Sequence, residues 1–436
     1  MREKDGVFYL RKDKKQEIKD KLKGKISFLR QPHSIINKEF LGEKNYQGLK
    51  HFVVYPIKMS KYHSKIYMKI WKESGREGVY NAPRQASLFI FPDGSTGTKG
   101  FKKYIKQKET SSSIIGTRKS IVTFRMKEDL RKGLKGKDNK ETLKNIKKYS
   151  AVYAKVIEQI LETKGNCFVY SDLVLGGGCV IFSLLLELFG YIKANGKDGT
   201  KRLRYAILTN KTVSTQQLRR ITKRFNKKDN MHGEYIQIII GSKAISEGFS
   251  FKNVLFECIL TPHWNYSETA QALARGIRLG SHNDLLEQGI NPTVKIMQTV
   301  AIPRKNPKDS IDLLKYQKSE DKDITIRRLL RLLMETAFDC SLNYMRNFVN
   351  GQDGSRDCYY KTCNYKCNDM NMQMVKEGLR DDQIDYSTYQ LYYANPNVPK
   401  IRKKIEQLFR TNSRMTLDSI IDNLSDSFSE EDILNA

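Results

Sequence analysis

The sequence has no apolar run long enough to cross a bilayer. Its longest uncharged apolar stretch extends from Leu173 to Leu186, contains three consecutive glycines and ends at Glu187, whereas a membrane-spanning helix needs about 20 residues. The N-terminus, MREKDGVFYLRKDKK, also lacks the apolar core of a secretory signal. These absences predict a chain that is neither secreted nor embedded in a membrane.

Cysteine and acidic residues are both scarce. Seven cysteines in 436 residues exclude a disulfide-rich scaffold and favour a reducing compartment. Against 78 Lys+Arg there are only 48 Asp+Glu, so the formal net charge is +30. Such a surplus indicates polyanionic partners: polyphosphates, nucleic acid or an anionic membrane surface. Hydrophobic residues, at 39% of the chain, can still fill a core, which excludes wholesale disorder.

The central part of the chain alternates apolar strands with helical patterns. The predicted strands lie at Cys167–Ser171, Arg204–Leu208, Tyr235–Ile240, Val254–Leu260 and Val294–Ile302. The predicted helices between them lie at Gly178–Phe189, Thr215–Phe225 and Ser267–Leu279. This alternation is typical of a parallel sheet with helices on both faces. We therefore predict an α/β fold with one parallel-sheet lobe and helical, basic flanking regions.

The basic surplus is densest between Lys99 and Tyr149, where 17 Lys/Arg oppose 5 Asp/Glu. Two interpretations stay open for this segment. It is either a solvated, partly disordered insertion or a surface that contacts the phosphates of nucleic acid. On the second interpretation the candidate nucleic-acid-binding residues are Lys99, Lys102, Lys103 and Lys106.

A polar and basic motif follows the strand predicted at Val254–Leu260. Gln271, Arg275 and Arg278 are spaced by four and three, which on a continuous helix puts them on one face. We expect this face near the carboxyl ends of the parallel strands, where two guanidinium groups suit a triphosphate. Taken alone, the spacing is weak evidence and is better explained by a solvated helix face.

The block from Gly241 to His282 resembles motifs V and VI of superfamily 2 helicases and translocases. It is most similar to the branch of large DNA viruses, which includes the poxvirus nucleoside triphosphate phosphohydrolase I and early transcription factor small-subunit types. Lys164–Gly190 resembles motif IV of the same family, and further segments extend the resemblance over about residues 20–370.

This resemblance implies a RecA-like helicase C-terminal lobe that acts with ATP and Mg²⁺ on nucleic acid, either DNA or RNA. Arg275 and Arg278 would be arginine fingers, and Gln271 would sense the nucleotide. A turn upstream would couple the nucleotide to the nucleic acid, through a glycine that lets the backbone approach closely; it comprises Ser246, Glu247 and Gly248. A viral protein of this kind is expected in the virion or the infected-cell cytoplasm, and any other in the cytoplasm or nucleus.

The resemblance also implies a division of the chain into four parts. Residues 1–60 would be a remnant or linker from the end of a first lobe, and residues 61–148 a helical basic insertion. Residues 149–306 would form the RecA-like lobe. Residues 307–436 would form a helical region with a Cys-rich loop.

The sequence lacks the first lobe that these helicases need. It contains no G-x-x-x-x-G-K-[ST] phosphate loop, for which Gly94–Lys99 is the nearest approach, and no acidic box at the end of an apolar strand. Three hypotheses stay open. The chain is half of an enzyme in viral transcription, completed by a separate chain or a transcription complex; or a basic transcription factor without hydrolysis; or the product of a split gene.

Four cysteines near the C-terminus suggest a structural metal site. Four thiolates can complete a tetrahedral Zn²⁺ site, and these four fall within 28 residues: Cys340, Cys358, Cys363 and Cys367. The alternative is a set of ordinary buried or reduced thiols.

Overall fold

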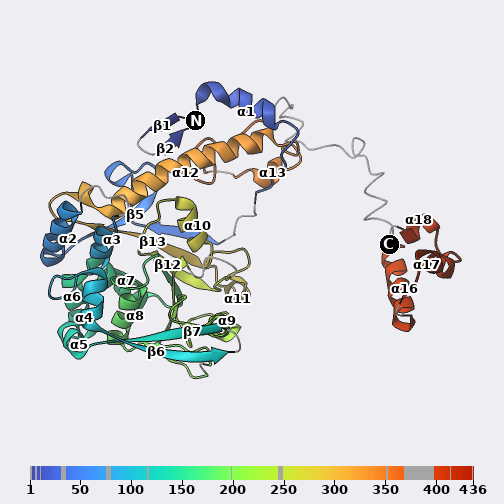
Figure 1. The fold of residues 1–436 in the computed structure, drawn as a ribbon. Coiled ribbons are helices and arrows are strands. Elements are labelled where there is room, and N and C mark those ends of the chain that lie inside the picture. The colour runs from blue at the N-terminus through green and yellow to red at the C-terminus, as the bar shows by residue number, and fades with distance from the viewer. Residues whose placement is uncertain are drawn as a thin grey trace. The chain divides into compact units, whose positions relative to one another are not determined.

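The computed structural model describes residues 2–4, 7–9, 11–30, 36–74, 80–114, 117–197, 199–243, 249–349, 352–367, 397–412, 414–434 and 436. The chain divides into two compact units, Met1–Tyr365 and Lys366–Ala436 (Figure 1). None of the helices in the described part of the chain is long and apolar enough to span a membrane.

A nine-stranded sheet forms the centre of the first unit (Figure 1). Its strand order is β4-β5-β13-β12-β8-β11-β10-β9, and β3 also pairs with β13. Every pair is parallel except β4–β5. The strands are β3 (Asn37–Leu41), β4 (Glu43–Lys44), β5 (Val53–Lys58), β8 (Asn166–Tyr170), β9 (Ile192–Lys193), β10 (Arg204–Leu208), β11 (Ile238–Gly241), β12 (Val254–Ile259) and β13 (Thr293–Ile302). The predicted α/β fold with a parallel sheet is confirmed.

The central strands are mostly apolar because both faces of the sheet are covered. On β8, Cys167 and Val169 face one hydrophobic core, while Phe168 and Tyr170 face the other. The first core includes side chains of α7 (Ala151–Glu162) and α8 (Cys179–Leu186). The second includes those of α9 (Thr215–Phe225).

Strands from near the N-terminus complete the sheet. β3 pairs with β13 from Asn37↔Thr293 to Leu41↔Met297, and β5 continues along the same strand. Between them Gly42 has a φ of +121°, and a Cβ there would lie 2.1 Å from the Val54 carbonyl oxygen. Only glycine fits this approach.

Helices and a hairpin surround the sheet. The basic segment forms α4 (Gly97–Tyr104), the β6–β7 hairpin (Ile105–Ile114, Thr117–Met126), α5 (Glu128–Leu134) and α6 (Asn139–Tyr149). Its apolar side chains anchor it in the first core, so partial disorder is wrong for the described residues here: Phe101, Leu130, Leu134 and Ile146 are buried. The other elements are β1 (Arg2–Lys4), β2 (Val7–Tyr9), α1 (Lys15–Leu22), α2 (Lys61–Glu73), α3 (Asn81–Leu88), α10 (Tyr266–Leu273), α11 (Asn283–Leu286), α12 (Ile311–Thr336) and α13 (Tyr344–Asn347).

Two buried carboxylates of the long helix α12 form hydrogen bonds with segments that are distant in the sequence. Glu320 accepts hydrogen bonds from the backbone N–H groups of Lys50, His51 and Phe52, at 2.7–2.8 Å. Asp323 accepts two from the Arg356 guanidinium, at 2.8 and 3.0 Å. The segment before β5 and the Cys-rich loop are thus held on one helix.

The second unit is a small helical module. It contains α16 (Val398–Thr411), α17 (Leu417–Leu424) and α18 (Glu430–Leu434). Its core consists of Ile401, Leu424 and Ile433.

Candidate functional site

The helix that begins the basic motif ends before the two arginines. Gln271 lies on α10, which ends at Leu273, and Arg275 and Arg278 lie in the turn beyond it. At the base of this turn, a Cβ on Gly276 would lie only 1.9 Å from Oε1 of Glu257. The helix ends at Leu273, and the turn after it packs the backbone of Gly276 directly against Glu257 of β12. The prediction of one continuous helical face is therefore wrong.

The turn lies at the amino end of β12, and the prediction of the carboxyl ends is also wrong. The Phe251 N–H donates to the Arg275 carbonyl and the Asn253 N–H to that of Ser281, each at 2.8 Å. Because α10 runs back along β12, its end returns to the start of that strand.

Both guanidinium groups contact the segment that precedes β12. Arg275 Nη1 donates to the Phe249 carbonyl at 3.0 Å, and Arg278 Nη1 donates to Ser250 Oγ at 2.9 Å. Ser246, Glu247 and Gly248, which were expected to couple nucleotide and nucleic acid, lie outside the described residues.

The turn opens into a hollow of about 800 Å³, here called the cationic cleft. Its lining includes five cationic side chains and one carboxylate, besides Gln271: Arg30, Lys38, Arg275, Arg278, Arg327 and Asp357. The Asp357 carboxylate accepts from Arg30 Nη2 at 2.9 Å. Burial, followed by the nearby Arg356 charge, lowers the pKa of Arg327. Crowded and partly desolvated cations of this kind favour a polyanionic ligand.

A second hollow of about 430 Å³, here called the aromatic pocket, adjoins the cleft. The two share lining residues Lys38, Ala274, Ile277 and Asp357. Rings line the pocket from four separate segments: Phe40, His51, Phe52, Tyr266 and Tyr360.

Below the turn, Glu257 is fully buried in the middle of β12. Burial raises the pKa of Glu257 well above its usual range, while the charge of Lys38 and the backbone of Gly276 act in the opposite direction. Burial therefore favours the protonated form of this carboxyl group.

Comparison with known proteins identifies the region that carries this site. Residues 154–280 match the family described as helicase conserved C-terminal domain. This region is a helicase C-terminal domain.

Three similar proteins come from viruses. "Putative helicase 087L" of Invertebrate iridescent virus 3 is 40% identical over 364 residues, which cover 81% of this chain and 35% of that protein. "Putative helicase 009L" of Frog virus 3 (isolate Goorha) is 32% identical, over 86% of this chain and 36% of that protein. Nucleoside triphosphatase I of Heliothis armigera entomopoxvirus is 27% identical, over 70% of this chain and 47% of that protein. The chain thus spans about a third of the length of the first two relatives.

Half of the cleft comes from outside the helicase C-terminal domain and was missed by sequence reasoning. Arg30 and Lys38 precede the domain, and Arg327 and Asp357 follow it. More than 200 positions separate Arg30 and Lys38 from motif VI, and about 50 to 80 separate Arg327 and Asp357 from it. The only sequence signal of the three cations is positive charge, which is common throughout a chain with 78 Lys+Arg.

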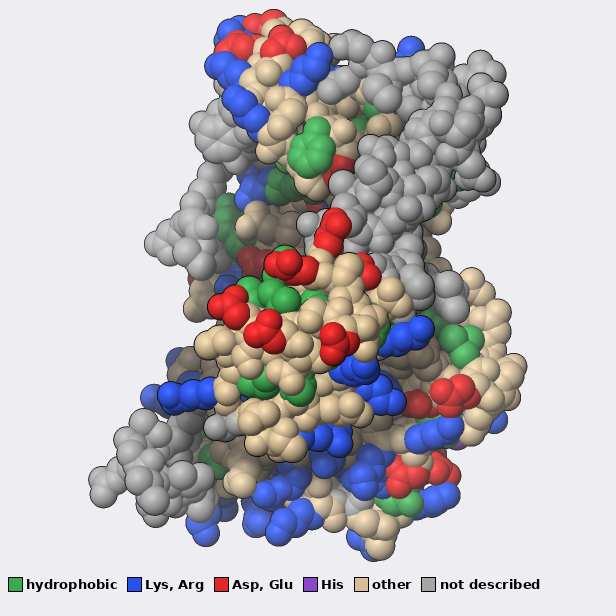
Figure 2. All heavy atoms as spheres, turned by 90° about the vertical axis from the view of Figure 1, so that its right-hand side faces the viewer, with side chains coloured by type: hydrophobic (Ala, Val, Ile, Leu, Met, Phe, Trp, Pro, Cys, Tyr) green, Lys and Arg blue, Asp and Glu red, His purple; other side chains and the backbone are tan. Residues whose placement is uncertain are grey.

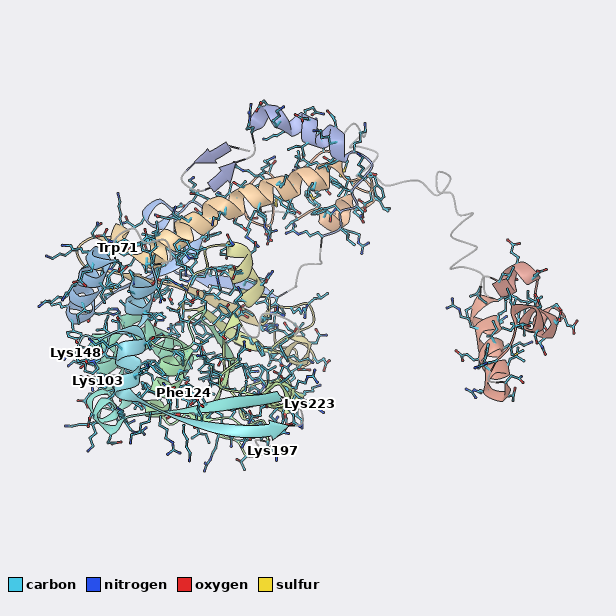
Figure 3. All side chains as sticks on the ribbon, in the orientation of Figure 1. Trp71, Lys103, Phe124, Lys148, Lys197 and Lys223 are labelled. Atoms are coloured by element: carbon cyan, nitrogen blue, oxygen red, sulfur yellow. A yellow bond between two sulfur atoms is a disulfide. The ribbon has the colours of Figure 1, made fainter. Side chains whose placement is uncertain are left out.

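The four lysines proposed to bind nucleic acid lie outside the cleft. Lys99, Lys102 and Lys103 are on α4 and Lys106 is at the start of β6, and all four are exposed. Lys103 forms an ion pair with Asp93 at 2.8 Å. Figure 3 shows Lys103 and Lys148 on the side of the unit that carries α4–α6. Lys and Arg side chains also gather over the lower part of the face drawn in Figure 2.

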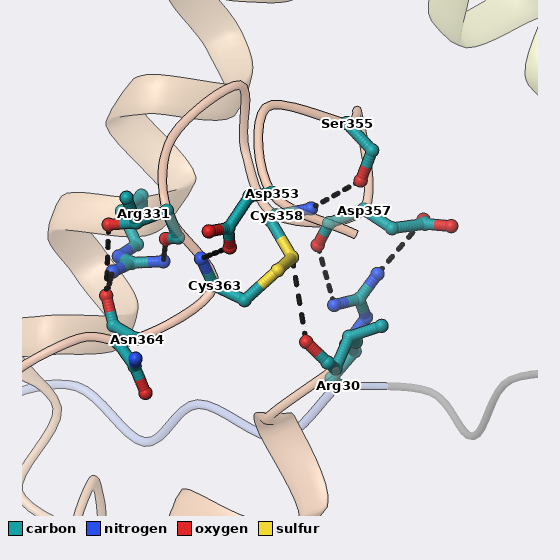
Figure 4. The surroundings of a disulfide bond; sticks show 10 residues. Arg30, Arg331, Asp353, Ser355, Asp357, Cys358, Cys363 and Asn364 are labelled. Atoms are coloured by element: carbon teal, nitrogen blue, oxygen red, sulfur yellow. Dashed lines mark hydrogen bonds and ion pairs between the residues drawn. A yellow bond between two sulfur atoms is a disulfide. The ribbon is translucent and has the colours of Figure 1, made fainter. Parts of the chain in front are cut away.

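The Cys-rich loop contains disulfides instead of a zinc site. Cys358 and Cys363 are bonded to each other (Figure 4), and Cys340 and Cys367 are disulfide-bonded as well. Sulfur in a disulfide has no thiolate to offer a metal. Within the described residues, no group of three or more His, Cys, Asp or Glu could hold a metal ion. The predictions of zinc and of uniformly reduced thiols are wrong for these four cysteines.

Proposed function

We propose that this chain is the C-terminal lobe of an ATP-dependent nucleic-acid helicase or translocase that acts in viral transcription. One observation carries the proposal: Gln271, Arg275 and Arg278 line a single cationic cleft together with cations from three other segments. Guanidinium groups placed there would neutralise charge that develops on a transferred phosphoryl group. In other systems this effect is worth ~10³–10⁵ in rate.

The cleft suits a triphosphate but does not suit Mg²⁺ by itself. Its carboxylate, Asp357, is already engaged by Arg30 at 2.9 Å, and Mg²⁺ prefers several oxygen ligands. The remaining ligands would come from the phosphates and from a first RecA-like lobe with an acidic box. A separate chain or a transcription complex would supply that lobe.

The contacts of the two arginines support a route from nucleotide to nucleic acid. Both hold the segment at Phe249 and Ser250, which directly follows the expected coupling residues Ser246, Glu247 and Gly248. A phosphate that drew either guanidinium away would release this segment. We expect the nucleic-acid backbone to bind there.

Reconstitution tests the proposal. Alone, the chain should hydrolyse ATP at background rate, because nothing in its sequence forms a phosphate loop. A chain that carries the phosphate loop and acidic box should restore turnover that nucleic acid stimulates. Arg275→Ala and Arg278→Ala should each lower that turnover by orders of magnitude.

Arg219→Ala is the matched control, since Arg219 is exposed on α9 and does not line the cleft. Rapid hydrolysis by the chain alone, or full turnover by both motif VI variants, would contradict the proposal. Salt-sensitive binding without turnover in any reconstitution would favour the alternative, a basic nucleic-acid-binding transcription factor derived from a helicase.

A further inference from the structure

The aromatic pocket has the features of a site for a flat heterocycle. Its rings come from β3, the segment just before β5, α10 and the Cys-rich loop: Phe40, His51, Phe52, Tyr266 and Tyr360. Phe52 stacks on Tyr266 with centroids 4.0 Å apart, and His51 tilts against Tyr360 at 4.4 Å. Phe40, by contrast, is 38% exposed at the mouth of the pocket. An aromatic ring left open beside a hollow offers a stacking face.

One buried side-chain oxygen in the pocket has no hydrogen-bond partner among the described residues. Gln298 is 1% exposed and lines the pocket. Its Nε2 donates to the Val53 carbonyl at 2.8 Å, while its Oε1 accepts no hydrogen bond from the described residues. Buried acceptors are normally satisfied. An exocyclic amino group of a nucleobase would satisfy this one.

The pocket leads directly to cations. Lys38 and Phe40 are two residues apart on β3, so they project from the same face of the strand. Lys38 lines both the aromatic pocket and the cationic cleft. A ligand with a ring in the pocket and an anionic tail would therefore place its tail beside Arg275 and Arg278.

We propose that the aromatic pocket binds the base of a nucleoside phosphate whose phosphates lie in the cationic cleft. The ligand is either a free nucleotide or the unpaired end of a nucleic-acid strand, which share this chemistry. This inference rests on the proposed function in one respect: both require that the cationic cleft binds phosphate groups. Residues outside the helicase C-terminal domain would then select the base.

Direct binding to the whole chain tests the proposal without any hydrolysis. The probes are a fluorescent ATP analogue, a 5′-phosphorylated single strand with 2-aminopurine at that end, and inorganic tripolyphosphate. Phe40→Ala and His51→Ala should weaken at least one of the two base-containing probes five- to tenfold. Both should leave tripolyphosphate binding unchanged, whereas Lys38→Ala should weaken all probes that bind.

Matched controls separate the pocket from general surface effects. Phe409→Ala removes another half-exposed ring, His232→Ala an exposed histidine, and Lys295→Ala an exposed lysine of the neighbouring strand β13. All three should bind every probe like the unaltered chain. Thermal melts check that each variant is folded.

The pattern of losses identifies the source of the ligand. Loss confined to the ATP analogue assigns a free nucleotide, and loss confined to the oligonucleotide assigns a strand end. The proposal is overturned if neither base-containing probe binds, or if Phe40→Ala and His51→Ala bind both probes like the unaltered chain. Failure here would leave the turnover tests of Arg275 and Arg278 unaffected, so the two proposals can fail separately.

Discussion

At the scale of single residues, the position of the arginine turn depends on what lies beneath it. Gly276 packs against the buried carboxyl group of Glu257, with no room for even one additional carbon. The spacing of Gln271, Arg275 and Arg278 was visible in the sequence. The end of α10 was not, because it depends on a contact between a glycine and a strand residue 19 positions earlier.

Gly276→Ala should displace the turn and destabilise the fold by about 1–3 kcal/mol, the usual cost of overpacking. The same substitution in a Glu257→Ala background should cost less, because the space beneath the turn is then free. Denaturant unfolding of the four variants gives the coupling between the two sites. Gly133→Ala in α5 is the control, since a Cβ there meets no atom within 4 Å. If Gly276→Ala lowers the unfolding free energy equally in both backgrounds, the contact between Gly276 and Glu257 does not determine the position of the turn.

A buried histidine makes stability depend on pH. His63 on α2 is fully buried, and its Nε2 donates to the Ala86 carbonyl at 2.7 Å. Burial lowers the pKa of His63 to about 4, below the usual value near 6.5. The native state therefore binds this proton less readily than the unfolded chain. Its contribution to stability is present above about pH 6.5 and is lost as the pH falls toward 4.

His63→Gln should remove this dependence while it retains a side-chain N–H for Ala86. Between pH 7 and 4.5, the unaltered chain should lose about 2 kcal/mol more unfolding free energy than the variant. Urea titrations at several pH values measure the difference. His232→Gln, at an exposed position, should keep the slope of the unaltered chain. Parallel slopes for the unaltered chain and His63→Gln would show that His63 does not titrate as proposed.

At the scale of elements, local pattern and long-range pairing differ in what they reveal. The sequence predicts β8, β10, β12 and α9 correctly. Each strand is buried along most of its length, and α9 buries one face, so the local pattern of apolar residues is sufficient. β3 was not readable, since four of its five residues are exposed and its partner strand is more than 250 positions away. The aromatic pocket depends on that pairing and was missed for the same reason.

The lysines at α4 and the start of β6 make a prediction about salt. If Lys99, Lys102, Lys103 and Lys106 each contact a phosphate, replacing all four by Gln should reduce the slope of log affinity against log salt by up to about 3 for single strands. Folding should be unchanged because all four are exposed. A charge-matched control changes four exposed cations of α16: Lys400, Arg402, Lys403 and Lys404. If the slope of log affinity against log salt is unchanged in the four-lysine variant, these lysines do not contact nucleic acid.

At the scale of the whole molecule, the two units differ in the size of their cores. The first has extensive hydrophobic clusters, while the second rests on Ile401, Leu424 and Ile433 with a few partly buried neighbours. Small cores give marginal stability. We expect two thermal transitions, with the smaller one at lower temperature.

Ile401→Asp should abolish the smaller transition, because it puts a charge at a fully buried position. The main transition should keep its midpoint. Differential scanning calorimetry of the complete chain measures both. Lys403→Asp introduces the same charge at an exposed site and should leave both transitions in place. A single transition that moves as a whole would show that the two units unfold together.

The recruitment of β3 and β5 to β13 has a consequence for synthesis on the ribosome. Residues 37–58 are made early, but their partner strand begins at Thr293. At about 5–20 residues per second, the nascent chain waits roughly 10–50 s before these strands can pair. During that interval their edges are open to other chains. Production of this protein should therefore be sensitive to temperature, expression rate and chaperone supply, even when the finished fold is stable.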